Sequence, residues 1–169
     1  MSKLSHAMVS NITFGYADSE DRLWARLILQ DQSETMLWLT RALCQAFCNG
    51  LAKLLEERLV QTESSKMSVE QCQQHVRAEF FEAKTTTWSP TPPPPDKNSG
   101  TELKPSHGKL CHTIQITPGE QWQIKFCPPQ DQVMILALTR PQAHKILAAL
   151  LLQAHRAQWN LILEKDWLN

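Results

Sequence analysis

The sequence is poor in glycine, the residue on which most phosphate-binding and nucleophile-bearing loops depend. Its 169 residues include five glycines, and these form neither a Gly-rich phosphate loop nor a Gly-x-Ser-x-Gly turn. The metal-binding sequence His-Glu-x-x-His is missing as well. The adjacent acidic pairs Glu20-Asp21 and Glu56-Glu57 are typical of solvated turns and helix flanks. We therefore predict that the chain is not an enzyme and that it binds no cofactor.

The cysteines are few and lack the spacing of structural sites. There are five of them, an odd number, and no Cys-x-x-Cys pair occurs, which excludes a disulfide framework and a zinc ribbon. Cys44 and Cys48 share a helical face, and so do Cys72 and His75, but a zinc site needs about four ligands. The pattern favours reduced, mostly buried thiols and no metal site.

The sequence also lacks an excess of charge and a long apolar run. Seventeen basic residues balance seventeen acidic ones, which argues against a nucleic-acid partner because a phosphate backbone is bound by basic stripes. The longest apolar stretch, around residues 146–152, is far shorter than the ~20 residues that cross a bilayer. Residues 1–10 contain no apolar core of a secretory signal. We therefore expect a cytoplasmic protein that does not bind membranes.

What the sequence does contain is an internal duplication. The run Gln30-Asp31-Gln32 recurs as Gln130-Asp131-Gln132, and each copy leads into Leu-x-Leu-Thr-Arg. With one gap, seven positions match. Each copy is preceded by two segments with the apolar–polar alternation of half-buried strands, and each is followed by a helical pattern. The chain therefore contains two related β-β-β-α halves.

These halves predict a single α+β domain over residues 1–169. The first half covers residues 5–60 and the second covers residues 109–169. Between them lie an inserted helix over residues 66–86 and a Pro-rich, flexible loop over residues 87–108. We expect the strands to form a small antiparallel sheet, sandwich or barrel, and the sequence leaves open whether both halves share one sheet.

Two capping boxes mark the starts of helices. Ser68 with Gln71, and Thr139 with Gln142, have the spacing at which each residue caps the backbone of the other. After Thr139, apolar residues recur at helical spacing, and the pattern can be followed as far as Trp167. The sequence therefore predicts a long C-terminal helix.

Arg41 and Arg140 occupy equivalent positions in the duplication, in the first turn of each predicted helix. A positive charge is unfavourable there because the helix dipole places partial positive charge at the same end. We therefore predict that each arginine has a specific partner, such as a carboxylate of the other half. On this hypothesis, replacing either arginine by alanine lowers the melting temperature measurably.

Two of the six tryptophans lie at the far end of the predicted C-terminal helix, where little of the domain remains to cover them. Tryptophan is enriched at the centres of protein interfaces. We therefore predict a self-association surface, and hence a homodimer, that is formed by Trp159, Leu161, Ile162 and Trp167. The Pro-rich loop is a second candidate, as a docking peptide for a protein partner.

The order of the elements resembles the head-domain superfamily of DNA end-joining scaffolds and of the centriolar cartwheel. Three strands, a helical insertion, three further strands and a long terminal helix follow one another in both, and the resemblance covers most of the chain at the level of topology. It implies a small β-sandwich or barrel head with an inserted helix-turn-helix. It also implies a terminal helix that dimerises as a coiled coil.

Two functions of different classes fit these observations. The first is a non-catalytic protein–protein interaction or scaffold domain that self-associates through its C-terminal helix. The alternative is a small-molecule-binding or enzymatic domain with a site between the two halves, near Arg41 and Arg140. A stable dimer that dissociates when Trp159 and Leu161 are made polar favours the first function, and thermal stabilisation by a metabolite favours the second.

Overall fold

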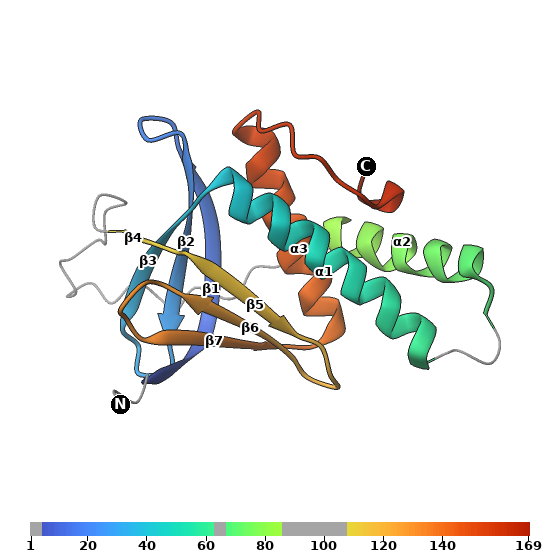
Figure 1. Ribbon diagram of the computed structural model, residues 1–169, viewed down its shortest axis with the longest axis horizontal. Helices are drawn as coiled ribbons and strands as arrows, with labels where there is room; N and C mark the ends of the chain where they lie inside the picture. The colour runs from blue at the N-terminus through green and yellow to red at the C-terminus, as the bar shows by residue number, and fades with distance from the viewer. Residues whose placement is uncertain (1–4, 63–66, 86–107) are drawn as a thin grey trace.

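The computed structural model describes residues 5–62, 67–85 and 108–169. Its elements follow the predicted duplicated order (Figure 1). The first half consists of β1 (His6–Ala17), β2 (Arg22–Leu29), β3 (Glu34–Leu39) and α1 (Arg41–Thr62), and the insertion contributes α2 (Val69–Thr85). After the short β4 (Lys109–Leu110) come β5 (Thr113–Thr117), β6 (Trp122–Cys127), β7 (Val133–Leu138), α3 (Arg140–Arg156) and the 3-10 turn η2 (Asp166–Leu168). The predicted Pro-rich loop lies outside the described residues, except for Gly108.

Both halves contribute to one seven-stranded sheet, in the order β4-β3-β2-β1-β7-β6-β5. Each half is an antiparallel meander, and the two meanders join where β1 pairs with β7 in parallel, with His6 opposite Val133. The α+β class is confirmed, but the sheet is mixed where the sequence predicted an antiparallel one. The reason is that the first and third strands of a meander run in the same direction, so two meanders placed in tandem meet in parallel.

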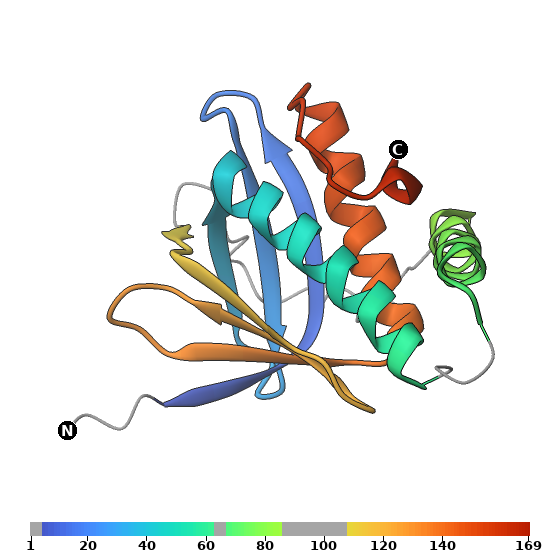
Figure 2. The ribbon, with the colours of Figure 1, turned by 45° about the vertical axis from the view of Figure 1, so that its right-hand side comes forward.

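The sheet is curled, and its two edge strands, β4 and β5, are separated in the sequence by only two residues, Cys111 and His112. β4 pairs with β3 in parallel, and β5 pairs with β6. Between β4 and β5, the N–H of Cys111 donates to the carbonyl of Trp38 at 2.9 Å. The N–H of the next residue, His112, donates to the carbonyl of Cys127 in β6 at 3.2 Å. These bonds extend the pairing of β4 with β3 and of β5 with β6, in the strongly curved sheet seen in Figure 2.

The duplicated Gln-Asp-Gln sequence forms the turn before the third strand of each half. Gln32 and Gln130 have positive φ values of 68° and 57°. Asp31 and Asp131 each accept a hydrogen bond from a backbone N–H one or two residues later, at 2.9 and 2.7 Å. Each carboxylate therefore stabilises its turn, but the residue with positive φ is the last of the first copy and the first of the second.

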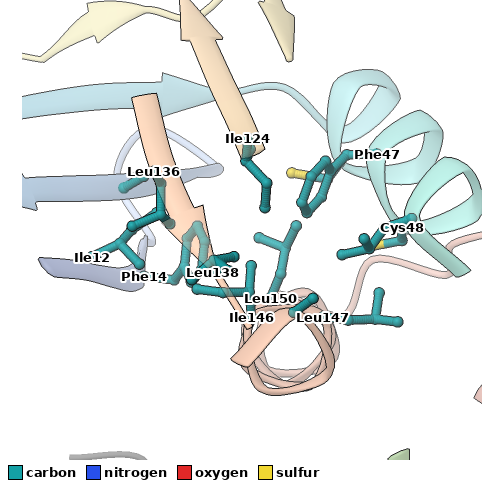
Figure 3. Packing of buried hydrophobic residues seen from close by; sticks show 14 of the residues in the cluster. Ile12, Phe14, Phe47, Cys48, Ile124, Leu136, Leu138, Ile146, Leu147 and Leu150 are labelled. Atoms are coloured by element: carbon teal, nitrogen blue, oxygen red, sulfur yellow. The ribbon is translucent and has the colours of Figure 1, made fainter. Parts of the chain in front are cut away.

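The helices form two layers on one side of the sheet. α1 and α3 lie against the sheet, and α2 packs on α1 and α3 from outside (Figures 1 and 2). Figure 3 shows the core where these elements meet, with labelled residues from α1 (Phe47, Cys48), from α3 (Ile146, Leu147, Leu150) and from the sheet (Ile12, Phe14, Ile124, Leu136, Leu138). In the described part of the chain, no helix has the length and apolar character that a bilayer crossing requires.

The helix starts agree with the sequence, whereas the last helix end does not. Ser68 and Gln71 exchange the two hydrogen bonds of a capping box, and so do Thr139 and Gln142. α3 ends at Arg156, so the prediction of a helix that continues to Trp167 is wrong. The chain turns back after α3, because burial of the apolar side chains that follow outweighs their local preference for helix.

Candidate functional site

Residues 157–169, called the strap below, fold back along the helices. From Trp159 to Trp167 the side chains alternate between covered and exposed positions, which is the period of extended backbone. Trp159 and Trp167 are buried, Leu161 is half-buried, and Ile162 is 72% exposed. The expectation that both tryptophans lie uncovered is therefore wrong, because the strap carries them onto the body of the domain. Whether any of the four residues contacts a second copy stays a prediction.

Side chains on one face of α1 hold the strap by its backbone. The side-chain oxygen of Gln45 accepts a hydrogen bond from the N–H of Ile162 at 2.9 Å. One turn later, Asn49 donates to the carbonyl of Ile162 at 2.8 Å and accepts from the N–H of Glu164 at 3.0 Å. Arg41, one turn before Gln45, donates to the backbone carbonyl of Asn160, so the contacts recur every four residues along a single ridge of the helix.

Both tryptophans of the strap also make polar contacts through their indole nitrogens. Nε1 of Trp159 donates to Oδ1 of Asp21, in the turn between β1 and β2, at 3.3 Å. Nε1 of Trp167 donates to Oε2 of Glu56 in α1 at 3.1 Å, and the ammonium of Lys165 lies 3.3 Å from the same oxygen. The two ends of the strap are therefore fixed to different parts of the first half.

Arg41 and Arg140 each have a specific partner, though not a carboxylate of the other half. Arg41 donates across the halves, but to the backbone carbonyl of Asn160, at 2.9 Å. Arg140 forms two hydrogen bonds of 2.9 and 2.8 Å with the carboxylate of Glu79, which belongs to the inserted α2. The two arginines therefore serve different contacts, and no shared site forms between them.

Glu79, Arg140 and His144 form a polar cluster between α2 and α3. His144 is 1% exposed, and its Nε2 lies 3.2 Å from Oε2 of Glu79; its Nδ1 has no hydrogen-bond partner in the described residues. Burial raises the pKa of Glu79, but hydrogen bonds from His144 and Arg140 outweigh this effect and lower the pKa to about 2. A carboxylate with so low a pKa is a poor general acid or base near neutral pH, and the contacts of the cluster join α2 to α3.

A groove, called the α3 groove below, runs along the outer face of α3 between the strap and the C-terminal end of α2. Its volume is about 720 Å³, which falls in the range of roughly 300–1,000 Å³ typical of small-molecule sites. The lining comes from α2 (Ala83, Lys84), α3 (Lys145, Ala148, Ala149, Leu151, Leu152, Ala154, His155) and the strap (Trp159, Asn160, Leu161, Leu163, Leu168). Most of these side chains are apolar, and Leu152 is 50% exposed in the groove wall.

The polar side chains of the α3 groove are basic or neutral. Lys84, Lys145 and His155 supply the basic groups and Asn160 an amide, while none of the described residues that line the groove is acidic. The ammonium of Lys84 lies 4.7 Å from the centre of the Phe80 ring. The groove therefore combines an apolar wall with an excess of positive charge.

The two groove lysines also lack acidic partners elsewhere in the described residues. The lysines that do pair with a carboxylate are Lys53, Lys109 and Lys165. Lys84 and Lys145 make no such pair within residues 5–62, 67–85 and 108–169.

The buried cysteines form neither a reactive site nor a metal centre in the described residues. Cys44, Cys48, Cys72 and Cys111 are buried free thiols. Burial raises the pKa of Cys44 to about 12 and that of Cys111 to about 11, so both thiols are protonated and unreactive at neutral pH. The described part of the chain contains no group of three or more side chains suited to hold a metal ion.

Glu79 and the α3 groove were not predicted from the sequence. A signal for Glu79 was present, since it is an acidic residue between Val76, Phe80 and Ala83, which belong to the apolar stripe of α2. A carboxylate beside a buried stripe needs a cationic partner. The groove left no comparable signal, because its wall depends on the turn that sends the strap back along α3.

Comparison of the chain with protein-family models, with curated proteins and with solved structures finds no match. The resemblance to the head domains of end-joining and cartwheel scaffolds rests on element order alone and stays a prediction. In the described residues α3 is 17 residues long and is followed by the strap, which differs from a coiled-coil stalk.

Proposed function

We propose that the chain is a non-catalytic binding domain whose α3 groove takes a small amphipathic anion, with an aliphatic tail and a carboxylate head. One observation carries this proposal. A single cavity joins an apolar wall with Lys84, Lys145 and His155, and none of its described lining residues is acidic. This composition suits a ligand that is apolar along its length and negatively charged at one end.

The position of the lysines gives the ligand a direction. Lys84, near the end of α2, and Lys145, in the first half of α3, line the same groove. From Lys145 the groove wall continues through Ala148 to Leu152, about 10 Å further along α3 at 1.5 Å per residue. The carboxylate therefore binds at the lysine end, and the tail extends along α3 towards Trp159.

Apolar burial supplies most of the affinity, and charge supplies the selectivity. Each buried methylene group contributes about 0.8 kcal/mol, so the tail decides whether a ligand binds. Lys84 and Lys145, which pair with no carboxylate among the described residues, attract an anionic head and repel a cationic one. The ranking of ligands that differ only in head group is therefore the informative measurement.

Calorimetry with three ligands of equal tail length tests the proposal. The probes are dodecanoate, dodecanol and dodecyltrimethylammonium, each kept below its micelle concentration and titrated into the full chain. We expect dodecanoate to bind most tightly, dodecanol more weakly, and the cation weakest. Equal affinities, or a preference for the cation, would contradict the proposal.

Variants of the full chain locate the binding. Lys145→Glu reverses a charge at the lysine end and should lower dodecanoate affinity at least tenfold, whereas Lys53→Glu, on an exposed part of α1 outside the groove, should leave it unchanged. Ala148→Trp places a large ring in the groove and should weaken all three ligands. Binding that survives both groove substitutions would place the ligand elsewhere and overturn the assignment.

A further inference from the structure

The connection between α3 and the strap is a short, strained turn. Gln158 has a φ of 56°, in the left-handed region. Its N–H donates to the carbonyl of His155, and the N–H of Trp159 donates to the carbonyl of Ala154, which is the Schellman arrangement at the end of a helix. Glycine usually occupies the position of Gln158, because a side chain is disfavoured there. A straight helix through this position would release the strain.

The strap sequence is compatible with two conformations. Ala154, Ala157 and Leu161 continue the helical spacing of α3, which is why the sequence predicts a longer helix. In the bent form, Leu161 and Leu163 face inward from extended backbone instead. Local preference and tertiary packing therefore favour different structures in the same segment.

The contacts that hold the bent strap do not depend on its covalent connection. Asn49 and Gln45 bind the strap backbone, and the two residues they contact, Ile162 and Glu164, are more than 110 positions away in the sequence. The turn at Gln158 is the only link between the strap and the end of α3. A strap that arrives from a second copy can therefore make the same contacts, which is the condition for domain swapping.

We propose that the strap exchanges between two copies of this chain. In the exchanged dimer, α3 continues straight through Gln158, and the strap of each copy lies on α1 of the other. Short connections under strain favour this kind of exchange. Each α3 groove is then completed by the strap of the second copy, so the partner contributes part of the groove wall. The exchange stands independently of the ligand proposed above, since none of its contacts involves Lys84 or Lys145.

Light scattering on the full chain, after incubation at high concentration, measures the dimer dissociation constant. Substitutions at Gln158, the hinge between α3 and the strap, test the exchange. Gln158→Gly removes the strain from the bent form alone, so the dimer dissociation constant should rise about thirtyfold, or about fivefold for each of the two hinges. Gln158→Ala keeps a side chain at the strained position and should leave the dimer at least as stable as in the unmodified chain. Position 158 is exposed, so both variants should fold.

Two further variants separate strap exchange from an ordinary surface dimer. Asn49→Ala removes a contact that is the same in monomer and exchanged dimer, so it should leave the monomer–dimer ratio unchanged and accelerate interconversion. Ile162→Asp alters an exposed side chain and should also leave the ratio unchanged. A dimer that Ile162→Asp dissociates and Gln158→Gly does not affect would overturn the proposal. A chain that stays monomeric at every concentration, with Gln158→Ala included, would overturn it as well.

Discussion

The guanidinium of Arg140 holds the carboxylate of Glu79 through two hydrogen bonds of 2.9 and 2.8 Å. Arg140 is the first residue of α3, and Glu79 lies in the inserted α2, so the pair joins the second half of the duplication to the insertion. His144 contacts the same carboxylate from within the helix interface. One carboxylate therefore connects α2 to two residues of α3, beside the buried apolar stripe with which α2 packs on the domain.

Glu79→Gln should reduce the free energy of unfolding by about 2–3 kcal/mol, because it leaves a half-buried guanidinium without its counter-ion. The matched control is Glu34→Gln, which breaks a similar pair with Arg26 on the more exposed surface of the sheet. That loss should stay below about 1 kcal/mol. Urea unfolding gives the free energy of unfolding of both variants. Equal losses would show that the less exposed position of the pair between Glu79 and Arg140 does not increase its contribution to stability.

Acid should weaken the same contact in a defined pH window. The pKa of Glu79 is about 2 in the folded chain, against an ordinary value of 4.5, so the folded state favours the ionised form. Its contribution is present above about pH 4.5 and is lost as the pH falls towards 2. Urea unfolding at several pH values should show the stability difference between the unmodified chain and Glu79→Gln shrinking through this window. A difference that does not vary with pH would contradict the assignment.

Arg140→Ala should lower the melting temperature more than Arg41→Ala. Arg140→Ala removes a bidentate ion pair, and the melting temperature of a chain of this size should fall by about 5–8 °C. Arg41→Ala removes one exposed hydrogen bond to a carbonyl, and the melting temperature should fall by about 1–3 °C. Differential scanning calorimetry gives both values. The reverse order would show that the strap contact at Arg41 matters more than the contact between helices.

Gly15→Ala should destabilise the sheet by about 1–3 kcal/mol. Gly15 lies opposite Trp24 on the neighbouring strand, and a methyl group at this position would overlap the indole ring. Gly50 provides the control, since a methyl group there meets a side-chain atom of Ile116 at 3.9 Å, an ordinary contact. Because Gly50 lies inside α1, Gly50→Ala should stabilise the chain by about 0.5–1 kcal/mol. Opposite signs in thermal unfolding are the expected result.

Asn49→Ala should release the strap locally without unfolding the domain. The N–H of Glu164 loses its acceptor, so its hydrogen exchange should accelerate about fivefold, the equivalent of about 1 kcal/mol. Lys53→Ala, one turn further along α1, leaves this bond intact and should not change the rate. Exchange measured by NMR at single residues distinguishes the two, and a uniform acceleration across the sheet would indicate global destabilisation instead.

Local patterns predicted the elements of this fold because their causes are local. The capping boxes at Ser68 and Thr139 formed as expected, since all their partners lie within three residues. The alternating strands and the duplication were also readable, because burial on one face requires a period of two. The parallel pairing of β1 with β7 was not readable, since no short-range rule relates residues more than 120 positions apart.

The sequence by itself determined the α+β class, the two β-β-β-α halves and the start of each helix, since propensity, spacing and capping act over a few residues. Only the tertiary structure decided where α3 ends, what covers Trp159 and Trp167, and which carboxylate Arg140 meets. In each case a helical or solvated state satisfies the local pattern equally well. Burial against α1 and α2 separates these alternatives, and it exists only once segments far apart in the chain have come together.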